Sequence, residues 1–275
     1  MKTLGMMGNT GPTTNIKRGP LCTLFPGKVL DFTTLRGNYD NSDPYSGFSI
    51  CGYTGDVPQH YGKCLHQLAD ALNVDINNII QPRQTHGSQV VMLNDNFFSM
   101  DLDERSKLLD GVDGLITSCK RVVVGVNTAD CVPVLLCACG QVPMVAAVHA
   151  GWRGTLAGIA AKAARMMLET CRAEDIAAYI GVSICCDCFE VGDEVADAFF
   201  TAGYTEMHHN TITGKAHINL QEINRRQLVD CGIAPEKTFI DGRCSRHDKS
   251  GNYFSARRMG IHSGRTFTGI MLETV

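Results

Sequence analysis

Three polar interruptions in apolar segments place possible metal ligands at the ends of expected strands. His86 lies in QTHGSQVV, Cys131 in NTADCVPVLL and His149 in AAVHAGWRGT. Two imidazole nitrogens and one thiolate suit zinc, and three protein ligands leave a fourth position open, as in catalytic zinc sites. A single histidine is more often a hydrogen-bonded core residue, and a single cysteine is more often packing. The metal hypothesis therefore rests on the three segments together.

The segment HAGWRGTLAG follows an expected strand, opens an expected helix and is a candidate anion site. Free N–H groups at a helix start attract anions, Thr155 can cap the helix, and Arg153 adds a positive charge. The segment lacks the Lys-Ser/Thr pair of a P-loop and the glycine spacing of a dinucleotide fingerprint. The alternative is that glycines such as Gly154 only permit a tight turn and close helix packing.

The chain contains 13 cysteines, spread over its length. The odd count, and an N-terminal segment without the apolar run of a signal peptide, favour free thiols over a disulfide framework. Cys185, Cys186 and Cys188 cluster in CCDC and are candidates for holding a metal or supporting the site. Packing is the favoured role, because no second Cys-X2-Cys pair lies at zinc-ribbon spacing.

Strand-sized apolar segments and amphipathic helices must position these residues. Residues 58–72 carry apolar side chains at helical spacing, and an Ala-rich helix is expected over 155–171. Strands joined by only a few residues, as around TADC, are expected to pair antiparallel within one large mixed sheet. Further helices are expected around 191–201 and over 219–232, and strands over 113–118, 121–127, 132–138, 142–149, 177–184, 237–241, 252–256 and 266–272.

The length of 275 residues and the absence of a repeat or a Pro/Ser-rich linker predict one α+β domain over 21–275, after a flexible lead over 1–20. The 25 basic and 28 acidic residues give no electrostatic basis for binding nucleic acid or an anionic membrane. Apolar stretches fall far short of the ~20 residues of a membrane span. We expect a cytoplasmic protein.

The segments around His86, Cys131 and His149, in this order, resemble the signature of the YfiH-like family. This family is also called the laccase-domain or multicopper polyphenol oxidase family and, more recently, the purine nucleoside phosphorylase family. The segments DFTTLRG, GVDGLIT, YIGVSICCDCFEVGDEV, NLQEINRRQL and YFSARR also match, so the resemblance covers about residues 28–272. The chain departs from the family pattern at Val182, where proline is common, and in SICGYTGD and CSRHDKSGN.

The resemblance implies a single-domain α+β sandwich in which a mixed β-sheet is flanked by helices, as in cysteine hydrolase-like proteins. It implies a zinc ion, with copper as a possible substitute, held by His86, Cys131 and His149. The implied activity is phosphorolysis of adenosine, inosine and S-methyl-5′-thioadenosine, with adenosine deamination as a side activity. A purine nucleoside and phosphate are therefore the expected partners, and a homodimer is a candidate assembly.

For this chemistry each candidate residue has an expected role. A cysteine that binds zinc is a thiolate and cannot also serve as a free acid. The expected catalytic residues are Asp130, Cys131 and Arg153, and the expected substrate-binding residues are Asn127, Arg153, Gly154 and Thr155.

Other activities stay open. Copper-dependent phenol oxidation is one, but a multicopper oxidase needs a blue-copper site and a three-copper cluster rich in His-X-His pairs. The chain has 9 histidines and no such pair. Another is a thiol hydrolase or amidase with Cys131 as nucleophile and His149 as base. A non-catalytic binding protein would leave the three polar strand ends unexplained.

Overall fold

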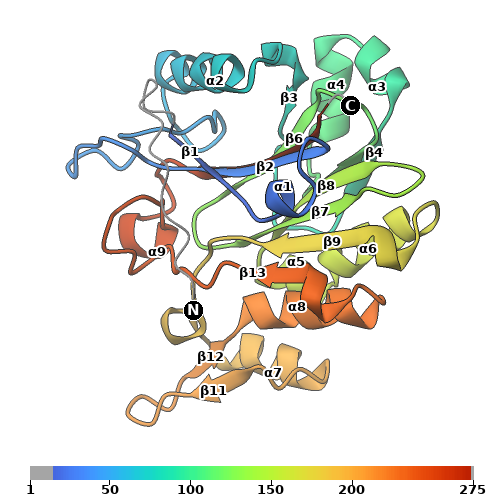
Figure 1. Cartoon of the computed structure of the whole chain (residues 1–275). Helices are drawn as coiled ribbons and strands as arrows, with labels where there is room; N and C mark the ends of the chain where they lie inside the picture. The colour runs from blue at the N-terminus through green and yellow to red at the C-terminus, as the bar shows by residue number, and fades with distance from the viewer. Residues whose placement is uncertain (1–14, 274–275) are drawn as a thin grey trace, which may run out of the picture.

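Two β-sheets packed face to face form the centre of the molecule, and helices cover both outer faces (Figure 1). The computed structural model describes residues 15–273. Both faces of each sheet are covered, so the central strands are buried along their whole length. The predicted α+β class is confirmed, with two large sheets where the sequence indicated one.

The six-stranded sheet has the order β13-β9-β7-β8-β5-β4 and mixes parallel with antiparallel pairs. The five-stranded sheet has the order β1-β2-β14-β6-β3, and a small sheet has the order β10-β12-β11. The strands are β1 (Ile16–Arg18), β2 (Val29–Thr34), β3 (Ile79–Ile80), β4 (Val90–Leu93), β5 (Gly114–Thr117), β6 (Val123–Thr128), β7 (Val132–Ala138), β8 (Met144–Ala150), β9 (Ile176–Ile180), β10 (Glu190–Val191), β11 (Met207–His209), β12 (Ala216–Ile218), β13 (Thr238–Ile240) and β14 (Thr266–Leu272).

The helices form the outer layers. The α-helices are α1 (Leu21–Leu24), α2 (Pro58–Leu72), α3 (Asp95–Ser99), α4 (Leu102–Leu109), α5 (Trp152–Leu156), α6 (Ile159–Leu168), α7 (Asp193–Thr201), α8 (Leu220–Asp230) and α9 (Ala256–Met259). Short 3-10 helices cover Ile76–Asn78, Ala173–Asp175, Cys186–Cys188 and Pro235–Lys237. None of the helices within residues 15–273 has the length and apolar character needed to cross a membrane.

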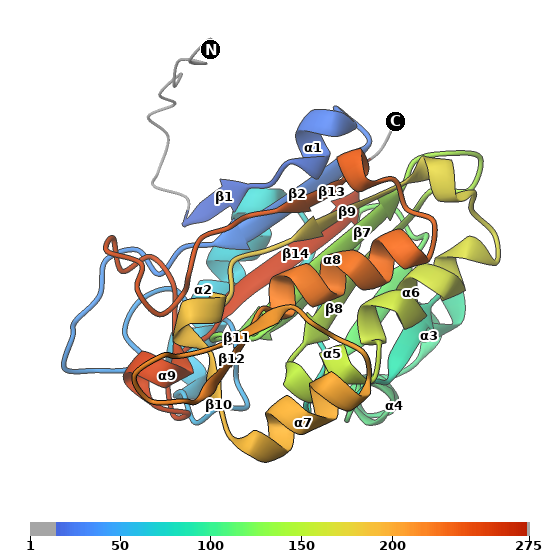
Figure 2. The ribbon, with the colours of Figure 1, turned by 90° about the horizontal axis from the view of Figure 1, so that it is seen from below.

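Three apolar clusters hold the layers together. Alternate residues of β7 and β8, such as Val134 and Val148, pack against α6 and α8. Their neighbours, such as Leu135, face the other way and meet the five-stranded sheet. Helix α2 covers the far side of that sheet, where Leu68 packs near Phe32. Figure 2 shows α6 and α8 side by side over β7, β8 and β9.

The turn between β6 and β7 corrects the expectation of a hairpin. Strand β6 pairs with β14 and β3, whereas β7 pairs with β8 and β9 in the other sheet. The short polar segment Ala129–Cys131 therefore carries the chain from one sheet to the other. This crossing explains why an acid and a thiol interrupt two buried strands, because the polar segment emerges where both sheets end. The hairpin expected between β7 and β8 is present.

The helix predicted over 155–171 is broken, and its first part begins earlier, at Trp152. Gly158 has φ 70°, a left-handed conformation that glycine adopts easily, and it separates α5 from α6. The helix predicted over 58–72 is confirmed as α2.

The strand expected over 252–256 is absent, and side chains satisfy some of its backbone groups instead. The N–H of Phe254 donates to Thr266 Oγ1, and the carbonyl of Tyr253 accepts from Arg258. At the other end of the chain, residues 16–18 pair with β2, so the sheet begins before residue 21. The rest of the expected flexible lead, residues 1–14, lies outside the described residues.

Candidate functional site

His86, Cys131 and His149 converge on one point at the edge of the six-stranded sheet. Each offers one ligand atom, and these atoms all lie within 4.8 Å of one another. The pairing of β7 with β8 places Pro133 opposite His149, so Cys131, just before β7, lies beside the end of β8. His86 joins them from the loop between β3 and β4. Its ring centroid lies 4.8 Å from that of His149, with the two rings nearly perpendicular.

The carboxylate of Asp113 positions two of these three residues. Its Oδ1 lies 2.7 Å from Nδ1 of His149, and it also accepts a 3.0 Å bond from the backbone N–H of His86. The N–H groups of Thr85 and Gly87 donate to Oδ2 at 3.3 and 2.7 Å. Asp113 is fully buried directly before β5. Because Nδ1 of His149 contacts Asp113, Nε2 is the nitrogen through which His149 can bind a metal ion.

Sequence reasoning missed Asp113 as a site residue. It appeared only within GVDGLIT, as part of a matching segment. The available signal was an acid between a valine and an expected strand, where a buried charge would be stable only with strong hydrogen-bonding partners.

The site stabilises a thiolate beside an imidazolium. Burial alone would raise the pKa of Cys131, but the charge and hydrogen bonding of His149 and His86 lower it to about 6. Burial alone would lower the pKa of His149, but Cys131 and Asp113 raise it to about 9. Burial would likewise raise the pKa of Asp113, and the bond to His149 brings it below its ordinary value. These shifts favour the charged forms of all three groups.

Gly151 forms one wall of the site. A Cβ atom at this position would lie 3.2 Å from Cδ2 of His86 and 3.3 Å from Sγ of Cys131. The absence of a side chain at Gly151 therefore leaves space beside the candidate ligand atoms. His149 is buried, Cys131 is partly exposed and His86 is exposed, so the site opens to solvent on the His86 side.

Asp130 connects the site to the C-terminal segment. Its carboxylate accepts a 2.6 Å bond from the Ser245 hydroxyl and a 2.7 Å bond from the backbone N–H of Arg257. Its backbone carbonyl accepts from the N–H of Ile184 at 2.9 Å. With φ 90°, Asp130 holds a strained turn next to Cys131. These hydrogen bonds indicate that Asp130 positions the turn that carries Cys131.

Asn127, an expected substrate residue, is buried in β6. Its side-chain amide donates to Gln81 at 2.6 Å, and its backbone N–H and carbonyl both bond to the Gln84 side chain. Its side-chain oxygen is buried and has no hydrogen-bond partner among residues 15–273. Asn127 thus joins β6 to the segment that leads toward His86.

The three candidate anion-binding residues, Arg153, Gly154 and Thr155, have different environments in the structure. Arg153 is exposed, its guanidinium carbon lies 4.1 Å from the centroid of the Trp152 ring, and it forms no ion pair within residues 15–273. Gly154 is buried, and a Cβ there would lie 2.9 Å from the carbonyl oxygen of Gly87. Its role is therefore close packing of α5 rather than contact with a substrate.

Thr155 does not cap a helix, which corrects the expectation from the sequence. Gly151 is the N-cap of α5. Thr155 is fully buried, and its hydroxyl accepts a 2.9 Å bond from the side chain of Asn224 on α8. Its hydroxyl therefore has no surface from which to bind a substrate.

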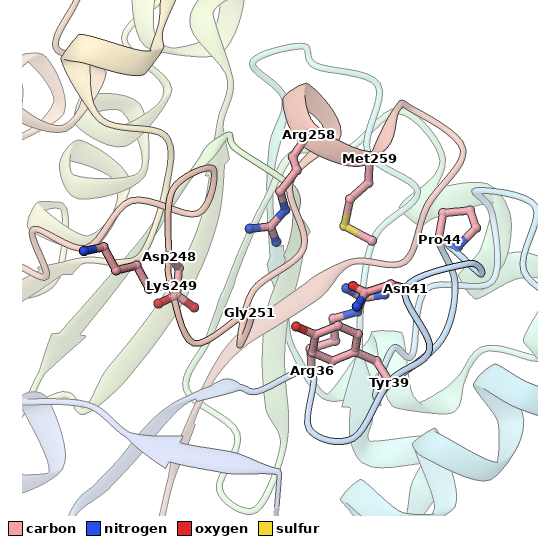
Figure 3. Close-up of a pocket in the computed structure, with 9 residues that line it drawn as sticks. All are labelled: Arg36, Tyr39, Asn41, Pro44, Asp248, Lys249, Gly251, Arg258 and Met259. Atoms are coloured by element: carbon pink, nitrogen blue, oxygen red, sulfur yellow. The ribbon is translucent and has the colours of Figure 1, made fainter.

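A cavity of about 440 Å³ lies beside α9, and its lining includes the basic residues Arg36, Lys249 and Arg258 and the acidic residue Asp248 (Figure 3). Arg258 extends toward it from α9, and the guanidinium of Arg36 lies 3.8 Å from the centroid of the Tyr39 ring. The side chain of Lys249 extends away from it. Arg257, the chain neighbour of Arg258, donates its backbone N–H to Asp130.

Comparison with known proteins gives the family. The model of the family described as multi-copper polyphenol oxidoreductase laccase matches residues 30–273. The chain belongs to this family. It is 44% identical over 246 residues to a protein named adenosine deaminase RL5 from an unknown prokaryotic organism, covering 88% of this chain and 93% of that protein.

Other proteins are similar to this laccase-family chain over most of its length. The chain is 35% identical over 253 residues to a purine nucleoside phosphorylase from Bacteroides thetaiotaomicron, covering 89% of this chain and 92% of that one. A crystal structure of a Bacillus licheniformis hypothetical protein, YfiH, superposes with a TM-score of 0.80 at 27% identity, covering 89% and 93% of the two chains. YlmD from Geobacillus stearothermophilus gives 0.80 at 25% identity, covering 91% and 93%.

The donor set of this laccase-family chain fits a metal ion. Two imidazoles and a stabilised thiolate suit either zinc or copper. A carboxylate on the far nitrogen of a ligand histidine is a common feature of metal sites, because it fixes the ring and strengthens the ligand. His149 and Asp113 have this arrangement.

Proposed function

We propose that the chain is a purine nucleoside phosphorylase that acts on adenosine, inosine and S-methyl-5′-thioadenosine, with adenosine deamination as a side activity. The observation that carries the proposal is the convergence of His86, Cys131 and His149, with Asp113 behind His149. The relatives named for these two activities each align over most of the chain.

The three residues would hold one zinc ion. When bound there, zinc supplies a Lewis acid that polarises an oxygen of a substrate or a water molecule. Asp113 keeps Nε2 of His149 directed at the site, and Cys131 contributes a thiolate. Gly151 keeps the space between the ligands free.

In phosphorolysis, a phosphate oxygen bonds to C1′ of the ribose while the bond from C1′ to the purine nitrogen breaks. The electron pair leaves with the purine, which takes up a proton. This step needs a positively charged site for phosphate, and exposed Arg153 is the candidate that the sequence indicates. The cavity at Arg36 and Arg258 is a second place for an anion. Asp130 positions the turn that carries Cys131.

The test is an elemental analysis of protein purified without added metal, followed by assays on the same sample. Adenosine plus phosphate should give adenine and ribose 1-phosphate, and adenosine alone should give inosine and ammonia. Cys131→Ala should abolish both reactions, whereas Cys119→Ala, a partly exposed thiol outside the site, should leave them intact. Copper in the sample together with turnover of phenols and none of nucleosides would support an oxidase instead.

A thiol hydrolase is the second candidate, because Cys131, His149 and Asp113 form a line of nucleophile, base and orienting carboxylate. The presence of His86 favours the metal-site interpretation over the hydrolase, since a catalytic triad has no role for a second imidazole beside the sulfur. Hydrolysis of an ester or amide by chelator-treated protein, lost on addition of zinc, would favour the hydrolase.

A further inference from the structure

A second group of metal-binding side chains lies in two loops that follow neighbouring strands. Strands β9 and β13 are parallel and pair Ile180 with Ile240, so both chains leave the sheet at the same edge. Cys185 and Cys188 lie in the loop after β9, and Cys244 and His247 lie in the loop after β13. The backbone N–H of Ser245 donates to the carbonyl of Ser183 at 3.0 Å and holds the two loops together.

The four ligand atoms have the spacing of a tetrahedral site. They all lie within 4.8 Å of one another. Nδ1 of His247 is 3.3 Å from Sγ of Cys188 and 3.8 Å from Sγ of Cys185. With bonds of about 2.3 Å to sulfur and about 2.0 Å to nitrogen, neighbouring ligands of a tetrahedral zinc lie roughly 3.4–3.8 Å apart. Small side-chain adjustments would bring all four onto one ion.

We propose that Cys185, Cys188, Cys244 and His247 form a structural zinc site, separate from the site at Cys131. Four protein ligands close the coordination sphere, whereas the three at Cys131 leave one position open. The Cys-X2-Cys and Cys-X2-His spacings are those of structural zinc ligands. None of the three cysteines is paired in a disulfide.

This proposal takes up the alternative that the CCDC thiols hold a metal, in place of the favoured expectation that they pack. Cys185 and Cys188 are partly exposed. The second half of the ligand set is Cys244-X2-His247, which a search for paired Cys-X2-Cys segments does not find.

The bound ion would brace the turn that carries Cys131. Ile184, next to Cys185, donates its N–H to the carbonyl of Asp130. Ser245, next to Cys244, donates its hydroxyl to the Asp130 carboxylate. Both loops that supply ligands therefore hold Asp130 from two sides. Loss of the ion should loosen this turn as well as the loops themselves.

The experiment uses the Cys131→Ala/His149→Ala variant, which leaves the second ligand set intact. After purification without added metal, we expect about one zinc ion per chain by elemental analysis. Replacement of this zinc by Co²⁺ should give thiolate-to-cobalt charge-transfer bands and the intense visible bands of tetrahedral cobalt. Adding Cys188→Ser and His247→Ala should remove the ion and the spectrum. In an otherwise unchanged chain, Cys188→Ser should lower the melting temperature.

Cys186→Ser is the matched control. This thiol lies between two proposed ligands but contacts Nδ1 of His208 at 3.4 Å instead, so its loss should leave zinc binding unchanged. The proposal fails if the folded Cys131→Ala/His149→Ala variant binds neither zinc nor cobalt. It also fails if that variant holds iron instead, or if intact mass under non-reducing conditions reveals a disulfide between Cys185 and Cys188 without metal. Zinc that stays bound after Cys188→Ser and His247→Ala are added would also contradict the proposal. If the fourfold variant does not fold, the metal content of the Cys131→Ala/His149→Ala variant and the Cys186→Ser control still give the result.

Discussion

Asp113 lies directly behind His149, with Oδ1 of the carboxylate 2.7 Å from Nδ1 of the ring, although 36 positions separate them in the chain. The same carboxylate accepts backbone hydrogen bonds from His86 and Gly87. One buried charge therefore sets the ring orientation of one proposed ligand and the loop position of another. These bonds explain why the loop that carries His86 keeps a fixed position beside the buried end of β8, although His86 itself is exposed.

Asp113→Asn should weaken zinc binding at Cys131 by about 10- to 100-fold, because the neutral amide no longer strengthens His149 as a ligand. Competition with a coloured chelator measures the change. Asp110→Asn is the control, since that exposed carboxylate pairs with Arg83 on the surface, and such pairs contribute little. Equal zinc affinity in the wild type and Asp113→Asn would exclude a role for Asp113 at the metal.

Gly151→Ala should impair the site without unfolding the protein. The φ of −67° suits alanine, but the added Cβ would press on the ring of His86 and the sulfur of Cys131. We expect turnover to fall by about tenfold or more, since small displacements of reacting groups are costly. The free energy of unfolding should change by less than about 1 kcal/mol, because His86 is exposed and can shift.

Gly62→Ala provides the comparison for Gly151→Ala. Gly62 lies in α2, and a Cβ there would meet no atom within 4 Å. Replacing a helical glycine with alanine should leave activity unchanged and stabilise the protein by up to ~1 kcal/mol. Unimpaired turnover by Gly151→Ala would indicate that the ligands do not need the space beside them.

The sequence predicted the fold class and most elements, because apolar periodicity and short links are local signals. It did not predict that β6 and β7 belong to different sheets. A short polar turn such as Ala129–Cys131 is compatible with a hairpin or with a crossing between layers, and only the partners of each strand decide. Strand β6 pairs with β14, which lies at the far end of the chain.

Within the site, the candidate ligand types at His86, Cys131 and His149 were visible from the sequence, but the residues that position them were not. Asp113 acts through hydrogen bonds to a loop and a strand that are distant in the chain. Thr155 and Gly154 have the residue types of an anion loop, yet packing against Asn224 and Gly87 buries them. Burial of this kind depends on tertiary contacts that spacing does not reveal.

In metal-free protein, Cys131 should react with iodoacetamide at an unusually low pH. Its pKa of about 6 means that the thiolate dominates above pH 6, whereas an ordinary thiol near 9 is still protonated at neutral pH. His149, with a pKa of about 9, stays charged over this range and stabilises the thiolate. Peptide mapping should give a rate that rises through about pH 6 and then levels off.

Cys22 is the internal reference for this measurement. Burial and the nearby Asp31 raise the pKa of this partly exposed thiol, so its alkylation should begin only at alkaline pH. Zinc should protect Cys131 and leave Cys22 unaffected. A Cys131 profile that follows an ordinary thiol, or alkylation that zinc does not slow, would contradict the charged cluster and its metal role.

Arg153→Met should weaken the use of phosphate while sparing deamination, which does not consume phosphate. A charge-assisted hydrogen bond to phosphate is worth about 1.5–3 kcal/mol, so the KM for phosphate should rise by about tenfold to a hundredfold. Arg172→Met is the control, because Arg172 is an exposed cation engaged with Glu174 and Asp175. Kinetics at varied phosphate, with a melting curve for each variant, measure the effect.

The outcomes separate two roles for Arg153, contact with phosphate and support of α5, and a third case in which phosphate binds elsewhere. If it only stacks on Trp152 to brace α5, its loss should lower the melting temperature and reduce both activities together. If phosphate binds in the cavity beside α9, Arg258→Met should raise the KM for phosphate while Arg153→Met does not. Arg258 also holds the carbonyl of Tyr253, so its melting curve must accompany that result. An unchanged KM for phosphate in Arg153→Met would remove the anion role from this residue, because an exposed guanidinium that touches the co-substrate cannot be lost without cost.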